Sequence, residues 1–309
     1  MTVTGEVRPD QLGRTLIHEH VFAALPGFDL DVRDSLDDDE AVKTSVEVLR
    51  AAKEFGVQTV VDAAPLNWYR RPDLLERISE ESEVFIVACT GLYTERMGWP
   101  FHFKLLSEVD LAEIFAIELG QGMSHSAIRA GVIKIASGEG PLGKYDQRAI
   151  VAAVTAQRAT GAGIITHTTG PTGGLDQLRA IEDAGGDPSR VMIGHMDNVE
   201  SARAVADRGA FVGMDRVGHY RQMSHDDRLG LILSMIELGY ASQVLLSHDA
   251  VVYSKGRWFV AEDTPHWKHY GLTFLFREVL PRLREHGVSA DVLDAMLIVN
   301  PRRVLAGIY

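Results

Sequence analysis

Two histidines lie one residue apart in "TLIHEH" (15–20), directly after a short apolar run. Side chains at positions i and i+2 of a strand share one face, so His18 and His20 can point the same way while Glu19 points to the other face. Neutral imidazole nitrogens are good ligands for zinc and similar metals. The motif is therefore either half of a metal site or an incidental pair of histidines.

Three more potential metal ligands lie near the ends of other apolar stretches. They are His167 in "IITHTT", His195 in "MIGHMD" and Asp249 in "LLSHDA". Taken alone, each histidine fits a hydrogen-bonded core residue and the aspartate fits a capping residue. Four imidazoles in one pocket, however, are hard to explain without a metal. A carboxylate at Asp249 can bind a metal and accept a proton, whereas the neighbouring His248 is expected to face the opposite way.

A single lysine interrupts the apolar stretch "GVIKIAS" (131–137). Burying Lys134 as an ammonium ion is costly, and burial lowers the pKa of the amine toward neutrality. A neutral amine can capture carbon dioxide and become a carbamate, an anionic group that can bridge two metal ions. A Schiff-base lysine and an ion-paired lysine remain alternatives from these residues alone.

Eight short runs rich in β-branched residues predict the elements that carry these side chains. Near-continuous apolar character is typical of strands that are covered on both faces. The amphipathic segments between them often end at glycine, as at Gly56 and Gly161. The predicted strands cover residues 14–22, 57–65, 83–93, 131–137, 163–169, 191–197, 210–218 and 243–250.

This alternation predicts the α/β class and a (β/α)8 TIM barrel, formed as a single domain over residues 1–309. A doubly wound sheet is the alternative, but it has no need of eight units. Active sites of such barrels lie at the carboxyl ends of the strands, where all the candidate ligands fall. A last helical pair around residues 289–307 is expected to pack across the end or the side of the barrel.

Charge and composition limit the partners. The formal net charge of -12 argues against nucleic acid or an anionic membrane as the main partner. No run of 18 apolar residues predicts a membrane span. The one cysteine, Cys89, cannot form an intramolecular disulfide, and the first ten residues have no signal-peptide pattern. We therefore expect a cytoplasmic enzyme that acts on a small molecule.

The whole candidate set, placed on strands one, four, five, six and eight, resembles the binuclear amidohydrolase superfamily and its type of barrel. "LGRTLIHEH" (12–20) resembles the opening motif of the phosphotriesterase family within it, and "NPRRVL" (300–305) resembles the closing motif. The resemblance implies two divalent transition metal ions, with zinc expected and cobalt, manganese or iron as alternatives. It implies that one ion is held by His18, His20 and Asp249 and the other by His167 and His195.

The same resemblance implies that Lys134 is N6-carboxylated and bridges the ions together with a hydroxide. This hydroxide is then the nucleophile, and Asp249 accepts the proton and passes it to the leaving group. Two further stretches, "TGLYT" (90–94) and "DRVG" (215–218), resemble the phosphotriesterase-like lactonases. They imply that Tyr93 and Arg216 line the substrate pocket, although a packed rim tyrosine and a structural ion pair are the alternatives.

The implied activity is the opening of lactones, such as N-acyl homoserine lactones with a role in quorum quenching, or aliphatic lactones. Weak phosphotriesterase activity is expected beside it. Val217 and Ala250 depart from the family pattern, and Trp258 in the loop 251–271 is expected to form an apolar wall. The alternatives are another ester, amide or organophosphate hydrolase of the same family, or a barrel that has lost catalysis. A homodimer is the expected assembly.

Overall fold

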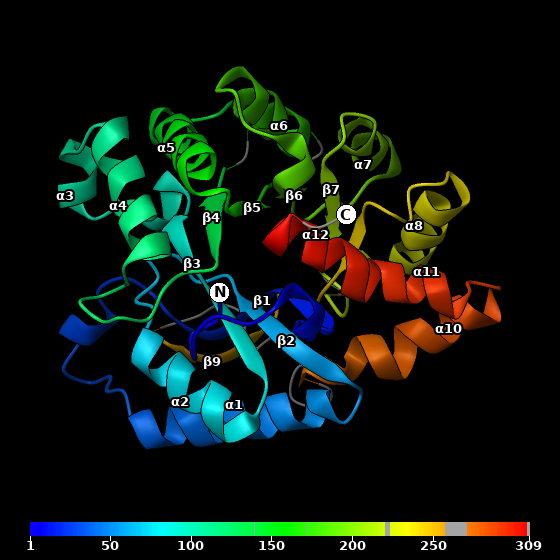
Figure 1. Ribbon diagram of the computed structural model, residues 1–309, viewed down its shortest axis with the longest axis horizontal. Helices are drawn as coiled ribbons and strands as arrows, with labels where there is room; N and C mark the ends of the chain where they lie inside the picture. The colour runs from blue at the N-terminus through cyan, green and yellow to red at the C-terminus, as the bar shows by residue number, and fades with distance from the viewer. Residues whose placement is uncertain (139, 171, 220–222, 257–270, 308–309) are drawn as a thin grey trace.

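The computed structural model describes residues 1–138, 140–170, 172–219, 223–256 and 271–307. Within these ranges nine strands form one sheet, and every paired neighbour runs parallel. Strands β1 to β8 follow one another in chain order, and β9 lies beside β1 (Figure 1). The strands are β1 (Arg14–Ala24), β2 (Val57–Asp62), β3 (Phe85–Leu92), β4 (Val132–Ala136), β5 (Gly163–His167), β6 (Val191–Ile193), β7 (Phe211–Met214), β8 (Val244–Leu246) and β9 (Val251–Lys255).

Helices surround this sheet on the outside (Figure 1). An acidic run begins α1, where the Asp37 side chain accepts hydrogen bonds from the backbone N–H groups of Asp39 and Glu40. The helices are α1 (Asp38–Lys53), α2 (Pro72–Ser82), α3 (Phe101–Leu105), α4 (Glu108–Gly120), α5 (Lys144–Thr160), α6 (Gly173–Asp183), α7 (Val199–Ala206), α8 (His225–Glu237), α10 (Leu280–Glu285), α11 (Ala290–Asp294) and α12 (Asn300–Ala306).

Short helical turns complete the described elements. The 3-10 turns are η1 (Pro9–Gln11), η2 (Phe28–Leu30), η3 (Glu95–Met97), η4 (Pro188–Arg190) and η5 (Gly271–Thr273), and the π-helical turns are η6 (Leu275–Val279) and η7 (Ala295–Val299).

Two buried layers fill the molecule. One lies between the strands and the helices. The other fills the barrel interior, where alternate strand residues meet, including Ile17, Val61, Cys89, Val132, Ile165, Met192, Phe211 and Leu245. A filled interior of this kind is typical of a (β/α)8 barrel, and the predicted fold is confirmed.

The eighth strand differs from the prediction. The expected strand 243–250 ends at Leu246. The residues after it bond to β1 partly through side chains, as Ser247 does, and partly through the backbone of Asp249 and Ala250. The expected loop 251–271 begins instead with β9, which pairs parallel with β1. Its residues Val251–Lys255 are all half-buried, so they lack the apolar signal of the other strands. Trp258 lies outside the described residues.

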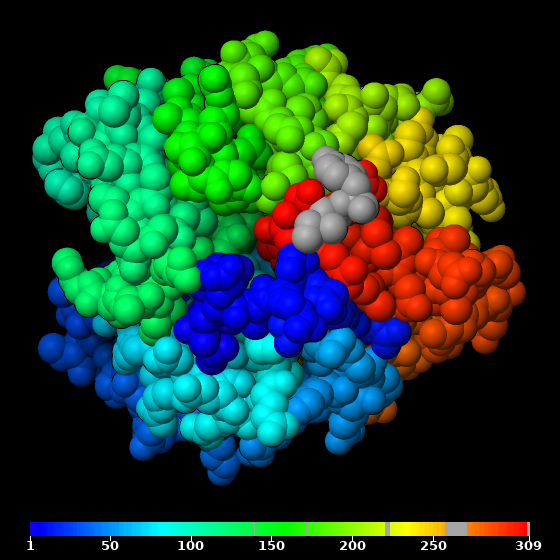
Figure 2. All heavy atoms as spheres, in the orientation of Figure 1, coloured from blue at the N-terminus to red at the C-terminus, as the bar shows by residue number. Residues whose placement is uncertain are grey.

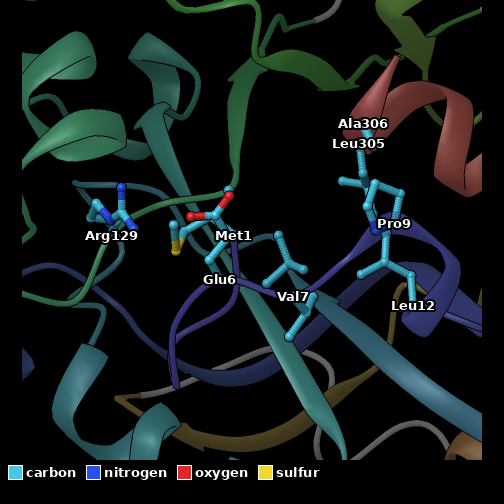
Figure 3. A pocket seen from close by; sticks show the side chains of 10 residues that line it. Met1, Glu6, Val7, Pro9, Leu12, Arg129, Leu305 and Ala306 are labelled. Carbon is cyan, nitrogen blue, oxygen red and sulfur yellow. The ribbon is translucent and has the colours of Figure 1, made fainter. Parts of the chain in front are cut away.

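The amino end of the barrel is closed by the two ends of the chain. Val304 of α12 packs into the interior cluster, so the last helical pair lies across the barrel end. Figure 2 shows the first residues and α12 meeting at the centre of this face. Between them lies a cavity of about 290 Å³, lined by Met1, Glu6, Val7, Pro9, Leu12, Val87, Arg129, Gly131, Leu305 and Ala306 (Figure 3). Among the described residues, no helix is both long and apolar enough to cross a membrane.

Candidate metal centre

The predicted ligands meet at the carboxyl end of the barrel. His18 and His20 lie on β1, Lys134 on β4 and His167 at the end of β5. His195 follows β6 and Asp249 follows β8. The positions thus come from five elements, as the barrel prediction requires.

The first group of ligand atoms gathers around one oxygen of Asp249. Its Oδ1 lies 3.3 Å from His20 Nε2 and 3.7 Å from His18 Nε2. Ligand atoms from these three residues lie close enough together to hold one metal ion. Lys134 Nζ lies 2.5 Å from His18 Nε2 and therefore at the edge of the same group.

The second group lies on the other side of Asp249. Its Oδ2 is 3.6 Å from His195 Nε2, which in turn is 2.7 Å from His167 Nδ1. The carboxylate of Asp249 thus faces one histidine group with each oxygen. Two adjacent sets of nitrogen and oxygen atoms, with Lys134 beside them, thus meet at Asp249.

Asp215 is a functional candidate that sequence reasoning missed. Its buried carboxylate lies 2.5 Å from His18 Nδ1 and 2.9 Å from His195 Nδ1, and it also accepts a hydrogen bond from the His195 backbone N–H at 2.8 Å. Both Nδ1 atoms are occupied in this way, which leaves the Nε2 atoms for the ligand groups. A carboxylate behind a histidine ligand fixes its tautomer and its orientation.

The signal for Asp215 was present but weak. Phe211, Gly213 and Asp215 alternate along and beyond β7, so the side chain of Asp215 is expected to enter the barrel. Nothing in the local sequence marks its two partners, because His18 lies 197 residues away.

Burial keeps three of the four imidazoles, those of His20, His167 and His195, neutral near pH 7. It lowers the pKa of His20, and it lowers the pKa of His167 well below its usual value, with neighbouring His195 adding to the effect. Burial, with the charge of Arg216, lowers the pKa of His195 to about 4. Neutral imidazole is the form that binds a metal.

Burial also lowers the pKa of Lys134 to about 8, although the charges of Asp249 and Asp215 oppose the shift. Lys134 is completely buried, and its neighbour His18 Nε2 is a ligand candidate rather than an anion. A substantial fraction of neutral amine is therefore present at mildly alkaline pH, and this is the form that reacts with carbon dioxide.

The two carboxylates stay ionised. Burial alone would raise the pKa of Asp215 and of Asp249, but neighbouring histidines outweigh it and lower both pKa values well below the usual range. For Asp249 the largest of these opposing effects comes from His195, followed by the hydrogen bond with His20.

Tyr93 and Arg216 both lie at this site. The Tyr93 hydroxyl is 3.0 Å from His167 Nδ1, and burial raises the pKa of the phenol, so it stays protonated. Arg216 Nε lies 3.4 Å from Asp249 Oδ2 and Arg216 Nη1 lies 3.5 Å from Asp197 Oδ2. Trp68, which sequence reasoning did not single out, packs between His20 and Tyr93 with ring centroids 4.8 and 4.5 Å away.

A profile of the phosphotriesterase family matches residues 1–305. The chain belongs to this family. A phosphotriesterase homology protein of Mycobacterium tuberculosis is 33% identical, and the alignment covers 98% of this chain and 96% of that protein. An aryldialkylphosphatase of Saccharolobus solfataricus is 29% identical over 96% of each chain.

A solved structure supports the same membership of the phosphotriesterase family. It is a variant of a PTE-like lactonase from Deinococcus radiodurans, with 35% sequence identity and a TM-score of 0.93 over 99% of both chains. Together with the family profile, this likeness identifies the chain as a metal-dependent hydrolase.

The residues present fit the two metal ions on which the phosphotriesterase family depends. Three histidines have lowered pKa values, two of them buried and His167 half-buried, and the carboxylate of Asp249 is ionised between the groups. A buried ammonium 2.5 Å from an imidazole nitrogen is an unfavourable neighbour for a cation, whereas a carbamate at Lys134 is a favourable one. The donor set of nitrogen and carboxylate oxygen suits zinc and similar divalent metals.

Proposed function

We propose that this chain is a binuclear-metal hydrolase that opens lactones, either N-acyl homoserine lactones or aliphatic lactones, with weak phosphotriesterase activity. The observation that carries the proposal is the position of Asp249, whose two oxygens each face a separate group of histidines. Under this proposal His18, His20 and Asp249 would hold one ion, His167 and His195 would hold the other, and N6-carboxylated Lys134 would be shared by the two.

Bound divalent ions, with zinc expected and cobalt, manganese or iron as alternatives, lower the pKa of water to near neutrality and polarise a substrate oxygen. The chain then has two tasks. Asp249 is ionised and would accept a proton at Oδ2, the atom that faces Arg216 Nε at 3.4 Å. Asp215 meanwhile holds His18 and His195 in the tautomer that presents Nε2 to the centre.

Tyr93 and Arg216 are proposed to act on the substrate. A protonated Tyr93 hydroxyl beside His167 can donate a hydrogen bond to a lactone carbonyl. Arg216 is a permanent cation, only 9% exposed, next to the proton acceptor. It can stabilise the carboxylate that ring opening produces.

The preference for lactones rests on the "TGLYT" and "DRVG" stretches and on the PTE-like lactonase neighbour. The alternative is another ester, amide or organophosphate hydrolase of the family. The aryldialkylphosphatase relative favours the organophosphate form of that alternative.

A substrate panel tests the proposal. The purified protein is assayed with N-acyl homoserine lactones, aliphatic lactones and paraoxon-like triesters. A kcat/KM for lactones at least 100-fold above that for triesters supports it, because such a ratio requires a site that stabilises the transition state of lactone opening. A larger value for triesters, or no turnover of either class, favours the alternative.

Lys134→Ala tests the bridging carbamate. Loss of the bridging anion is expected to remove metal and activity, and short carboxylates such as acetate should restore part of both. Elemental analysis of the wild-type protein should find two transition metals per chain. Unchanged metal content in the variant contradicts the carbamate, and active protein without metal contradicts the whole mechanism.

Three broader expectations stand as proposals. The chain is a single hydrolase domain over residues 1–309. A homodimer is favoured by exposed apolar side chains such as Leu30, Phe101 and Leu105, which a partner can cover. A cytoplasmic location fits a chain whose one cysteine, Cys89, is buried and free.

A further inference from the structure

The barrel closes between β1 and the segment after β8 through side chains and through two backbone hydrogen bonds, from the Asp249 N–H to the His18 carbonyl at 3.0 Å and from the His20 N–H to the Ala250 carbonyl at 2.7 Å. In the described residues β8 pairs with β7, while β1 pairs with β2 and β9. Side chains make much of the β1 to β8 junction, since Ser247 Oγ accepts a hydrogen bond from the His18 backbone N–H at 3.0 Å. Ser247 Oγ in turn donates to Glu19 Oε1 at 2.8 Å.

The Glu19 carboxylate accepts hydrogen bonds from the backbone of the segment that carries Asp249. Its Oε1 accepts the His248 backbone N–H at 2.9 Å, and its Oε2 accepts the Ala250 backbone N–H at 2.8 Å. The carboxylate thus holds the residue before Asp249 and the residue after it. It is fully buried, so water does not compete for these bonds.

The His248 side chain fixes Glu19 from the outer side of the barrel. His248 Nδ1 lies 2.8 Å from Glu19 Oε1, and His248 Nε2 accepts the Leu275 backbone N–H at 3.2 Å. This pair of contacts requires the neutral tautomer with hydrogen on Nδ1. His248 therefore faces the helical shell, as the sequence predicts, and connects Glu19 to η6.

The hydrogen bonds of Glu19 matter for Asp249 because the backbone of Asp249 has an uncommon conformation. Its φ is 54°, in the left-handed region that non-glycine residues seldom adopt. Aspartate adopts this conformation more readily than most residues, and here it directs the side chain at the two histidine groups. Strain of this kind persists only where neighbouring contacts fix the backbone.

We propose that Glu19 is a positioning residue that holds Asp249 in its left-handed conformation and so sets where the catalytic carboxylate stands. The inference rests on the proposed metal-dependent function, in which Asp249 binds metal and accepts a proton. Glu19 touches neither substrate nor metal ligand atoms, because its carboxylate faces His248, Ser247 and Ala250.

Glu19→Gln tests this role with little change in volume. An amide can accept at one oxygen only, so its NH2 group must face either Ala250 N–H or the donors of His248. We expect kcat to fall about 10- to 100-fold, because small misplacements of a catalytic group have effects of this size. KM should stay within about twofold, since substrate contacts are retained.

A second readout follows the metal centre directly. Protein loaded with Co²⁺ has visible absorption bands that depend on the number and geometry of the ligands. The Glu19→Gln spectrum is expected to differ from that of the wild type, since Asp249 is a proposed ligand. Glu19→Asp keeps the charge but is one methylene shorter, so it cannot reach both backbone N–H groups, and a smaller change of the same kind is expected.

Glu118→Gln is the matched control. Glu118 is also a buried carboxylate, which accepts hydrogen bonds from Arg70 and Thr90 away from the histidines. This variant should lower the unfolding temperature and leave kcat and the Co²⁺ spectrum unchanged. The comparison separates general destabilisation from misplacement of Asp249.

The outcomes are distinct. Wild-type kcat and a wild-type Co²⁺ spectrum in both Glu19 variants overturn the positioning role, as does failure of both variants to fold, which assigns Glu19 to barrel closure alone. A wild-type protein that binds no Co²⁺ contradicts the proposed metal centre instead. Loss of kcat with an altered spectrum in folded Glu19→Gln supports the inference.

Discussion

Asp249 combines two roles that one substitution can separate. As a ligand it needs an oxygen, and as a proton acceptor it needs a charge. Asp249→Asn keeps an oxygen and the side-chain volume but removes the basicity. We expect the variant to retain most of its metal, while kcat falls about 10²- to 10⁴-fold, the usual contribution of a general acid or base.

Parallel elemental analysis and steady-state kinetics check this prediction. Loss of both metal and turnover would instead make Asp249 chiefly a ligand. Full turnover in the metal-loaded variant would remove it from proton transfer.

Asp215 is expected to control metal affinity without touching the metal. Asp215→Asn leaves one accepting oxygen for two Nδ1 donors, on His18 and His195. One imidazole then loses its orienting partner. We expect metal to bind about 10- to 100-fold more weakly, as is typical when such a partner is removed. Competition with a coloured chelator measures the affinity, with Glu118→Gln as the control, and equal affinity in wild type and Asp215→Asn contradicts the role.

At the scale of elements, most strands can be predicted because burial on both faces requires a nearly continuous run of apolar residues. Lys134 and His167 stand out within such runs and could be assigned to the barrel mouth from sequence. The end of β8 could not be predicted, because Ser247 and Glu19 replace part of a backbone ladder there. The strand β9 was missed because its residues are only half-buried.

The candidate site could likewise be predicted only where a local pattern marks the residue. Residues on separate strands could be grouped because barrel geometry brings all strand ends together. Asp215 was missed, since its role depends on contacts with His18 and His195 that no local pattern records. Trp68 lies in a loop, where periodicity gives no direction for a side chain.

Close packing between β3 and β4 holds Lys134 in place. Gly91 is paired with Lys134 and has a φ of 110°, and a Cβ at Gly91 would lie 1.9 Å from the Lys134 carbonyl oxygen. Gly91→Ala is therefore expected to push the strands apart and to lower the free energy of unfolding by about 3 kcal/mol or more. Metal affinity should fall with it, because the Lys134 backbone moves.

Gly120→Ala is the control for this substitution. Gly120 lies at the end of α4, and a Cβ there meets no atom within 4 Å. Alanine should be neutral or stabilise by about 0.5–1 kcal/mol. Chemical denaturation and chelator competition measure both variants, and a Gly91→Ala protein with unchanged stability and metal affinity would contradict the role of this close packing.

Across the whole molecule, stability and chemistry occupy opposite ends of the barrel. The carboxyl end gathers polar groups whose pKa values burial has shifted. The amino end is closed by apolar contacts such as those of Val304, together with the first residues of the chain. Changes at the amino end are therefore expected to alter stability more than turnover.

Buried groups also make the free energy of unfolding depend on pH, and the histidines and Asp62 do so in opposite directions. The pKa values of His20, His167 and His195 are lower in the folded protein than in the unfolded chain, so acid favours the unfolded chain. The stabilisation from these histidines is present above pH 6.5. It is lost as the pH falls toward their folded pKa values, about 4 for His195. Asp62 acts in the other direction. Burial raises its pKa from 3.8 to about 7, so its contribution is present below pH 3.8 and is lost as the pH rises through 7.

Asp62→Asn isolates the second effect. Asp62 Oδ1 accepts the Val21 backbone N–H at 2.7 Å, while Oδ2 has no hydrogen-bond partner among the described residues. Asparagine keeps the acceptor and cannot ionise. Between pH 4.5 and 7 the stability of the variant relative to the wild type should therefore rise by about 1.4 kcal/mol per pH unit, and it should level off above pH 7. Denaturant unfolding of both proteins in the presence of a chelator measures this difference, and a difference that stays constant with pH would mean that Asp62 is ionised in the folded protein throughout.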